Sequence, residues 1–294
     1  MTGETATLLI GGGGALGRAM VDAWPSDLPP PTIWDRIAVP HQAGAALDLM
    51  DPGAVAEAAT RLPERLHVVH LAARLDVGAD PEATRQSISA NVAALLVPAS
   101  ALADRIATFT HVSSISVYGS GAHSPIRENA QLRPNSVYGA GKAAAETVSG
   151  ALARMWGWRH CVFRPTQLFA LSSADQSLPH LLMSASTSKR PLTLNADPQS
   201  LRDYLHVNDA AALLIEQCRL QRQGIYNVGA GAPVSLGDMF KTSSDRWNLP
   251  PVQAAPFAPR VDQYLDVSHT LAAFAWRPRN PVLEWLAQAE PGIG

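Results

Sequence analysis

The chain has 294 residues, of which 47% are hydrophobic and 16% are charged, and its formal net charge is −2. This composition indicates a globular protein long enough to bury a core, and it argues against a disordered chain or a nucleic-acid-binding protein. The first residues do not resemble a signal peptide, and no apolar stretch approaches the roughly 20 residues of a spanning helix. The two cysteines, Cys161 and Cys218, do not suggest a disulfide scaffold. We therefore expect a cytoplasmic protein without nucleic-acid or membrane partners.

Short apolar segments alternate with helical segments through the first half of the chain. The pattern predicts strands at residues 7–10, 32–34, 67–71, 109–113 and 161–163, and helices at 15–24, 52–62, 83–103 and 138–155. Pro98 is expected to kink or interrupt the third helix. Such alternation is typical of an α/β fold, here a doubly wound parallel sheet of the Rossmann type.

The second half of the chain has weaker periodicity. Residues 166–202 are rich in Ser, Thr and Pro, and proline-rich loops with short helices follow residue 229. A helix is predicted at 207–219 and a strand at 225–228. We predict a dinucleotide-binding domain at 1–165, to which 203–228 returns. A smaller, segmented C-terminal lobe for the substrate would comprise 166–202 and 229–294.

A glycine-rich turn follows the first predicted strand. Gly11, Gly14 and Gly17 are spaced G-x-x-G-x-x-G, and Ala15 and Leu16 begin the following helix. Glycines there allow a pyrophosphate to approach backbone N–H groups at the positive end of a helix. The motif predicts a dinucleotide site because it lies between a predicted strand and a predicted helix.

Asp35 ends the second predicted strand, about 20 residues after the turn. A carboxylate there can accept hydrogen bonds from a ribose and repels a 2′-phosphate, which favours NAD; the adjacent Arg36 keeps NADP open. Asp48 and Leu49 are candidates for contact with the adenine. The alternative is a flexible glycine loop with a surface aspartate.

Tyr138 and Lys142 lie four residues apart in a strongly helical segment, so they share one face. A free tyrosine has a pKa of roughly 10 and is a poor base at neutral pH. We expect the lysine ammonium and an oxidised nicotinamide to lower this pKa by about 3 units.

Ser113, Ser114 and Ser116 follow the strand at 109–113, at the sheet edge where ligands bind. A serine hydroxyl at this edge can orient a substrate oxygen toward the tyrosine. Ser113 or Ser116 can instead cap a turn.

Taken together, the motifs resemble the extended short-chain dehydrogenases/reductases, the NAD-dependent epimerase/dehydratase family. The resemblance covers nearly the whole chain and rests on Gly11, Gly14 and Gly17; Val69-His70-Leu71-Ala72-Ala73; Asn91; Ser113-Ser114; Val117-Tyr118-Gly119; Tyr138 and Lys142; Arg164-Pro165; Arg202-Asp203-Tyr204-Leu205-His206-Val207 and Asp209; Tyr226-Asn227-Val228-Gly229; and Trp276-Arg277-Pro278.

The resemblance implies a role for each matching residue. Tyr138 would be the acid/base, Lys142 its electrostatic partner and a ribose contact, and Ser114 the catalytic hydroxyl. Further cofactor contacts are implied at Leu71, Ala72, Ala73, Asn91, Arg164 and Pro165, and substrate contacts at Ser114, Ser116, Gln167, Arg202 and Arg260.

Arg202 and Arg260 resemble arginines that clamp a diphosphate in sugar-nucleotide enzymes; the alternative for each is a surface salt bridge. The family is often dimeric through two helices that match residues 90–103 and 138–155, so a homodimer is expected.

The chain departs from the family in ways that bear on the reaction. Ile115 and Ser116 stand where dehydratases carry an Asp-Glu pair, which argues against dehydration. Gln167 and Ala170 stand where sugar-nucleotide members commonly have Asn and Gly, which questions the nucleotide-sugar substrate. No metal site is expected, because the histidines lack zinc-ligand spacing.

We interpret the chain first as an NAD(P)-dependent oxidoreductase or epimerase that transfers hydride reversibly at a hydroxyl or ketone carbon of a sugar nucleotide or related polyol. The second interpretation is a carbonyl reductase or dehydrogenase of a small non-nucleotide substrate. The third is an NAD(P)-sensing protein without catalysis.

Overall fold

The computed structural model describes residues 5–74, 81–170, 177–194, 196–250, 252–254 and 259–290. The chain forms two compact units. Unit 1 comprises residues 1–119, 131–164 and 211–226, and unit 2 comprises 120–130, 165–210 and 227–294. The domain division drawn from the sequence stays a prediction.

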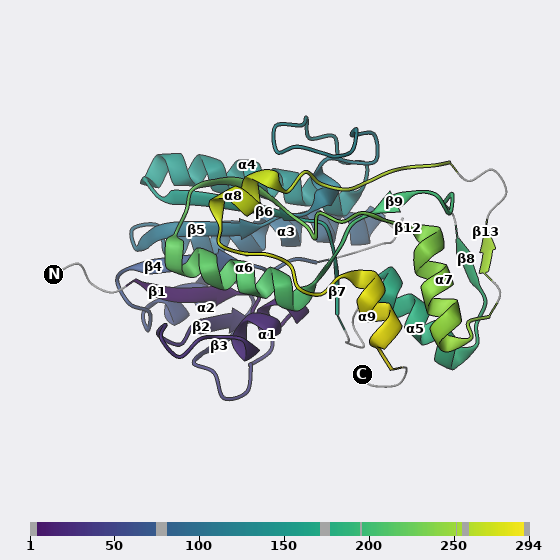
Figure 1. Ribbon diagram of the computed structural model, residues 1–294. Helices are drawn as coiled ribbons and strands as arrows, with labels where there is room; N and C mark the ends of the chain where they lie inside the picture. Colours follow the sequence, from purple (N-terminus) through teal and green to yellow (C-terminus); the bar gives the residue numbers. More distant parts are fainter. Residues whose placement is uncertain are drawn as a thin grey trace. The chain divides into compact units, whose positions relative to one another are not determined.

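The sheet of seven strands belongs mainly to unit 1 (Figure 1). Its order is β11-β6-β5-β4-β1-β2-β3, and the neighbouring pairs from β6 to β3 are parallel. The strands are β1 (Ala6–Ile10), β2 (Thr32–Asp35), β3 (Gly44–Ala46), β4 (Leu66–His70), β5 (Ile106–Val112), β6 (Arg159–Pro165) and β11 (Gly224–Val228). The order runs outward from β1 and β4 in both directions, which confirms the predicted doubly wound fold.

Helices of unit 1 follow the strands as the sequence pattern predicts. They are α1 (Ala15–Asp22), α2 (Pro52–Ala59), α3 (Pro81–Ala101), the short 3-10 helix η1 (Ile115–Val117) and α4 (Val137–Trp156), while α6 (Val207–Leu220) spans both units. Side chains of α2, α3 and α4 pack on the same face of the sheet as Leu8 and Val68. Burial of this apolar face is the main stabilising contribution to the unit.

Of the two expectations for Pro98, an interruption of α3 is wrong, because the helix continues through this residue, and a kink stays a prediction. Proline lacks the N–H that would bond to the carbonyl oxygen of Ala94. The imidazole of His70 replaces that donor, since its Nε2 lies 3.1 Å from the Ala94 oxygen. A carbonyl only accepts hydrogen bonds, so Nε2 carries the proton. The buried histidine thereby compensates for the proline.

Unit 2 contains three small two-stranded sheets and four helices among its described residues. The sheets pair β7 (Gln167–Phe169) with β10 (Tyr204–His206), β9 (Leu201–Arg202) with β12 (Val234–Ser235), and β8 (Leu192–Leu194) with β13 (Val252–Ala254). The helices are α5 (Leu178–Ser188), α7 (Leu236–Trp247), α8 (Ser268–Ala273) and α9 (Val282–Gln288). Its core gathers Phe169, Leu182, Met239 and Leu286.

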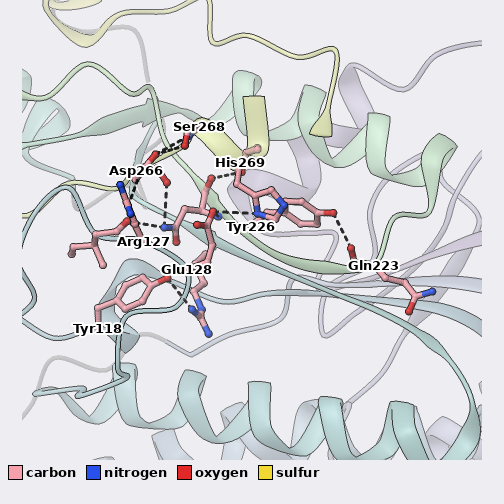
Figure 2. Close-up of polar contacts among 12 residues, drawn as sticks. Tyr118, Arg127, Glu128, Gln223, Tyr226, Asp266, Ser268 and His269 are labelled. Atoms are coloured by element: carbon pink, nitrogen blue, oxygen red, sulfur yellow. Dashed lines mark hydrogen bonds and ion pairs between the residues drawn. The ribbon is translucent and has the colours of Figure 1, made fainter. Parts of the chain in front are cut away.

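A polar network holds residues 120–130 within unit 2 (Figure 2). The Arg127 guanidinium lies 3.3 Å from an Asp266 carboxylate oxygen, and the Ser268 hydroxyl donates to Asp266 at 2.6 Å. Glu128 accepts a hydrogen bond from the Asn227 amide at 3.0 Å, and His269 Nδ1 lies 3.8 Å from the same carboxylate. Arg127 and Glu128 lie about 100 or more residues from Asp266, Asn227 and His269, so no local sequence pattern indicates this link.

No helix in the described ranges combines the length and apolar character needed to cross a bilayer. The same ranges hold no group of three or more histidine, cysteine or acidic side chains able to bind a metal ion.

Candidate active site

The glycine turn after β1 is shaped by close backbone contacts. Gly11 has φ +89°, and a Cβ there would lie 2.4 Å from the Ala72 amide nitrogen. A Cβ at Gly17 would lie 2.4 Å from the Gly12 Cα. At Gly14 the nearest atom would be the Gly11 carbonyl oxygen at 3.6 Å. Two glycines are therefore required by the fold, whereas Gly14 has room for a methyl group.

Helix α1 begins without a side-chain cap. Gly14 is its N-cap, and no acidic residue lies in its first turn. By contrast, Asp51 caps α2 by accepting hydrogen bonds from the amides of Gly53 and Ala54. The first N–H groups of any helix lack acceptors within the helix. Those at the start of α1 therefore remain available to an anion.

A cavity of about 330 Å³ opens at the carboxyl ends of β1, β2 and β4 in unit 1. Nine predicted cofactor residues line it: Gly11, Gly14, Asp35, Arg36, Asp48, Leu49, Leu71, Ala72 and Ala73. The structure adds Gly13, Ile37, Met50, Arg74, Ala90 and Ala94. Ile37 and Met50 are exposed apolar side chains, and their places beside Arg36 and Leu49 could have suggested them.

Asp35 connects the second strand to the glycine turn. Its Oδ2 accepts a hydrogen bond from the Gly13 amide at 2.9 Å. The next residue, Arg36, is exposed at the cavity. A carboxylate has about four acceptor positions, so Asp35 retains capacity for ligand hydroxyl groups.

Ala15, Leu16, Gly17, Asn91 and Pro165 are not among the cavity-lining residues. Asn91 is 2% exposed, and its amide group bonds twice to the backbone of Arg74, at 2.8 Å to the N–H and at 3.0 Å to the carbonyl. Asn91 thus fixes the loop that forms one cavity wall.

Arg164, a predicted cofactor contact, is buried, and its role toward a cofactor stays a prediction. Its side chain is 4% exposed and forms an ion pair with Glu146 at 2.6 Å. Its Nη1 also donates to the Tyr118 hydroxyl at 2.8 Å (Figure 2). A guanidinium satisfied inside the protein stays there, because exposing the partner carboxylate without it would be costly.

Ser114 and Tyr138 are brought together by two capped turns. Ser114 caps η1 after β5, and its Oγ accepts from the Ser116 amide at 3.1 Å. Ser136 caps α4, which places Tyr138 in the first turn of that helix. A Cβ at Gly139 would lie 2.5 Å from the Ser116 carbonyl oxygen, so this glycine allows α4 to contact the serine turn.

Burial raises the pKa of the Tyr138 phenol above its ordinary value, and a hydrogen bond with the Ser114 side chain opposes that shift. With the protein's own groups alone, desolvation disfavours the phenolate. The lowering expected from Lys142 together with an oxidised nicotinamide stays a prediction.

Lys142 lies one turn after Tyr138 and is 2% exposed. Its Nζ donates to the Val112 carbonyl at 2.8 Å, which leaves two of its three donors for other partners. Burial lowers the pKa of Lys142 to about 8, and the Glu146 carboxylate opposes that shift. Lys142 therefore keeps a positive charge at neutral pH.

The predicted substrate residues are divided between the units. Ser116 lies in unit 1, with its Oγ 3.2 Å from that of Ser114. Gln167, Arg202 and Arg260 lie in unit 2. Gln167 is half-buried in β7, where it pairs with Tyr204 of β10.

Both predicted clamp arginines are engaged within unit 2. Arg202 Nη1 donates to the carbonyl oxygens of Leu201 and Val261. Arg260 forms an exposed ion pair with Asp262 at 3.1 Å, which is the alternative that the sequence left open. Asp262 also accepts a hydrogen bond from the Leu201 amide at 2.9 Å, and the Leu201 carbonyl accepts one from Arg202.

Comparison with known proteins places these features in a family. The model of the NAD dependent epimerase/dehydratase family matches residues 7–229. A dTDP-glucose 4,6-dehydratase of Streptomyces antibioticus is 26% identical over 234 residues, which is 77% of this chain and 70% of that protein.

Among solved structures, the UDP-glucose 4-epimerase of Brucella ovis in complex with NAD has a TM-score of 0.84 at 20% identity, over 97% of each chain. RMD of Pseudomonas aeruginosa, complexed with NADPH, has a TM-score of 0.78 at 23% identity, over 96% of this chain and 97% of that one. These likenesses confirm the fold.

The family match spans the glycine turn, the serine turn and the Tyr138–Lys142 helix. The chain belongs to the NAD dependent epimerase/dehydratase family and is an NAD(P)-dependent enzyme of the extended short-chain dehydrogenase/reductase type.

Proposed function

We propose that this enzyme transfers hydride reversibly at a hydroxyl or ketone carbon of a sugar nucleotide, as an epimerase or as a dehydrogenase/reductase. The observation that carries the proposal is the grouping of Ser114, Tyr138 and Lys142 at the carboxyl ends of the same sheet that forms the glycine-turn cavity. Proton-transfer groups and a dinucleotide cradle within one unit match redox chemistry at a carbinol carbon.

The residues present fit a dinucleotide. The start of α1 has no side-chain cap, and Gly14 leaves room beside it. Gly11, Gly14 and the first amides of α1, including those of Ala15, Leu16 and Gly17, would hold the pyrophosphate. Other predicted cofactor contacts are Asp35, Arg36, Asp48, Leu49, Leu71, Ala72, Ala73, Tyr138, Lys142 and Pro165.

Asp35 supports NAD as the main cofactor. Its carboxylate would accept hydrogen bonds from ribose hydroxyls and repel a 2′-phosphate, while the exposed Arg36 beside it keeps NADP possible.

The chain's own groups supply the proton transfer. Ser114 would donate a hydrogen bond to the substrate oxygen, and Tyr138 would take the hydroxyl proton on its phenolate oxygen. When bound, an oxidised nicotinamide supplies the hydride acceptor and a positive ring charge. Lys142 stabilises the phenolate from the same helix face. In the reverse direction Tyr138 returns the proton to the ketone oxygen.

The dehydratase reaction of the Streptomyces relative is not part of the proposal. Here Ile115 is 5% exposed and apolar, and the Ser116 hydroxyl bonds to Ser114. Neither side chain can serve as the additional acid and base that removal of water requires.

Arg202 and Arg260 support a substrate with a diphosphate, because both can exchange their present partners for phosphate oxygens. Gln167 is a further candidate for substrate contact. A small non-nucleotide substrate is the second candidate, supported by the pairing of Arg260 with Asp262.

A homodimer through α3 and α4 is part of the proposal. Four apolar side chains are exposed on these neighbouring helices: Ile88 and Leu96 at 39% each, Met155 at 74% and Trp156 at 50%. Sedimentation of wild type and of Met155→Glu tests it; wild type sedimenting as a monomer would refute it.

Cys161 and Cys218 are buried free thiols, which supports a reducing compartment such as the cytoplasm.

The experiment that tests the function is a thermal-shift series with NAD, NADP, and NAD plus UDP, dTDP or GDP. A ligand at about 100 times its Kd adds roughly 2.7 kcal/mol of stability. We expect a shift with NAD and a second one with a nucleoside diphosphate. A cofactor shift without a diphosphate response favours the small-substrate reductase, and no cofactor shift at all refutes the proposal.

A further inference from the structure

A buried carboxylate lies one helical turn beyond Lys142. Glu146 is 8% exposed on α4, and Lys142 is 2% exposed. The carboxylate accepts a hydrogen bond from the Ser113 hydroxyl and binds Arg164 through Nη2 at 2.6 Å and Nε at 3.0 Å. Glu146 therefore contacts β5 and β6 from a position on α4.

Two side chains of α4 hold the end of β5. Lys142 donates to the Val112 carbonyl at 2.8 Å, and Glu146 accepts from the hydroxyl of Ser113, the next residue. Ser114 follows directly. The place of the Ser114 hydroxyl relative to Tyr138 thus depends on both contacts, because Tyr138 belongs to the same helix as Lys142 and Glu146.

The charges around Lys142 are unbalanced without Glu146. Arg164 of β6 is a second buried cation. His70 of β4 and His111 of β5 are neutral, since burial lowers the pKa of His70 to about 3 and that of His111 well below its ordinary value. Burial raises the pKa of Tyr138 and of Cys161 and lowers that of His160, so these three neighbours are uncharged at neutral pH. Arg154 is a further cation near His160.

We propose that Glu146 is a positioning residue of the active site, whose carboxylate keeps the buried Lys142 ammonium charged and fixes the end of β5 so that Ser114 stays beside Tyr138. Its consequence for turnover rests on the proposed function. If the carboxylate is removed, the two buried cations Lys142 and Arg164 lose the anion that acts on both of them. Lys142 then releases its proton at a lower pH, and the Tyr138 phenolate loses its charged partner.

The composition of the chain makes the Lys142 charge directly measurable. Its lysines are only Lys142, Lys189 and Lys241. Lys189 and Lys241 are exposed, so Lys189→Arg and Lys241→Arg assign their signals without disturbing the core. In protein labelled with 13C-lysine, the Cε resonance reports the protonation of each side chain against pH, without cofactor or substrate.

We expect Lys142 to titrate near pH 8 in wild type. Glu146→Gln should lower that midpoint by about one unit or more, because the carboxylate that opposes the effect of burial on Lys142 is lost. Glu146→Asp keeps the charge and should stay closer to wild type than Glu146→Gln. Ser113→Ala removes only a neutral hydroxyl, so its midpoint should match wild type. An unchanged midpoint in folded Glu146→Gln overturns the proposal.

Glu146→Gln removes the carboxylate that pairs with the buried Arg164 guanidinium, so this variant can fail to fold. The double variant Glu146→Gln/Arg164→Met removes both charges and provides the second measurement. Its Lys142 midpoint should fall below wild type, and above that of Glu146→Gln where the single variant folds. A double-variant midpoint equal to or above wild type overturns the proposal.

The titration separates this proposal from the proposed function. A chain that fails to bind NAD can still show the Lys142 shift, and a chain that binds NAD can lack it. Where turnover is observed, the alkaline limb of kcat/KM against pH should move to lower pH in Glu146→Gln. A purely structural role would lower turnover without moving that limb, which counts against the electrostatic role.

Discussion

Adding a methyl group at Gly14 or at Gly17 should affect different properties of the protein, although the two glycines belong to one turn. At Gly17 the added Cβ would lie 2.4 Å from the Cα and 2.5 Å from the carbonyl oxygen of Gly12. At Gly14 it would meet only the Gly11 carbonyl oxygen, at 3.6 Å, on a residue that lines the cavity. Gly17→Ala should therefore damage the fold, and Gly14→Ala should damage the ligand site.

The magnitudes follow from these contacts. Alanine is favoured over glycine inside a helix by about 1 kcal/mol, but overpacking costs about 1–3 kcal/mol, and backbone atoms cannot move aside cheaply. We expect Gly17→Ala to lose about 1–2 kcal/mol of unfolding free energy. Gly14→Ala exchanges one N-cap residue for a poorer one, at a cost of roughly 0.5 kcal/mol. Its methyl group should reduce NAD affinity about tenfold or more, which is about 1.4 kcal/mol.

Urea unfolding gives the stability of each variant, and calorimetric titration with NAD gives the affinity. Gly121→Ala is the matched control, because its Cβ would meet nothing within 4 Å and the residue is exposed in unit 2. It should match wild type in both assays. Wild-type NAD affinity in Gly14→Ala, together with undiminished stability in Gly17→Ala, would refute the reasoning.

Two further predictions concern buried histidines. His70→Leu should lower the free energy of unfolding by about 1–3 kcal/mol, because the Ala94 carbonyl loses its hydrogen-bond donor. The loss should be clearly smaller in a Pro98→Ala background, where the backbone N–H of residue 98 can replace that donor. Additive losses in the double-mutant cycle would contradict this. Burial lowers the pKa of His67 to about 4 and of His70 to about 3, so the unfolded chain binds these protons first as pH falls below 6.5. Lowering the pH from about 7.5 to 5.5 should reduce the free energy of unfolding by about 1.4 kcal/mol for each histidine. Over the same range Asp203, whose pKa burial raises to about 6, should increase that free energy by about 0.8 kcal/mol. His111, whose pKa burial lowers well below its ordinary value, adds a third loss of similar size. Urea unfolding should therefore show a net loss of about 3 kcal/mol or more, and constant stability across this range would contradict the assignment.

The sequence predicts nine of the residues that line the glycine-turn cavity, because the signals for them are local. The glycine turn, Asp35 at the end of β2 and the Tyr138–Lys142 spacing each lie within one strand–turn–helix step. Short-range geometry is enough to place such residues at the carboxyl edge of the sheet.

The remaining features depend on partners distant in the sequence. The guanidinium of Arg164 is buried against Glu146, 18 residues earlier, a pairing that local spacing does not indicate. Pro98 stays within α3 because His70, on another strand, supplies the missing hydrogen bond. The raised pKa of Tyr138 follows from burial, which residue spacing does not report. Only packing in three dimensions reveals these relations.

The central claim is that Tyr138 transfers the proton in an NAD(P)-dependent redox step. The most direct test compares wild type with Tyr138→Phe against a panel of UDP-, dTDP- and GDP-sugars, following both reduced-nicotinamide absorbance and sugar interconversion. Calorimetry should first show that both proteins bind NAD equally well. We predict that turnover falls about 100-fold or more in Tyr138→Phe, because the hydroxyl that carries the proton is gone. Equal turnover by the two proteins would contradict the account.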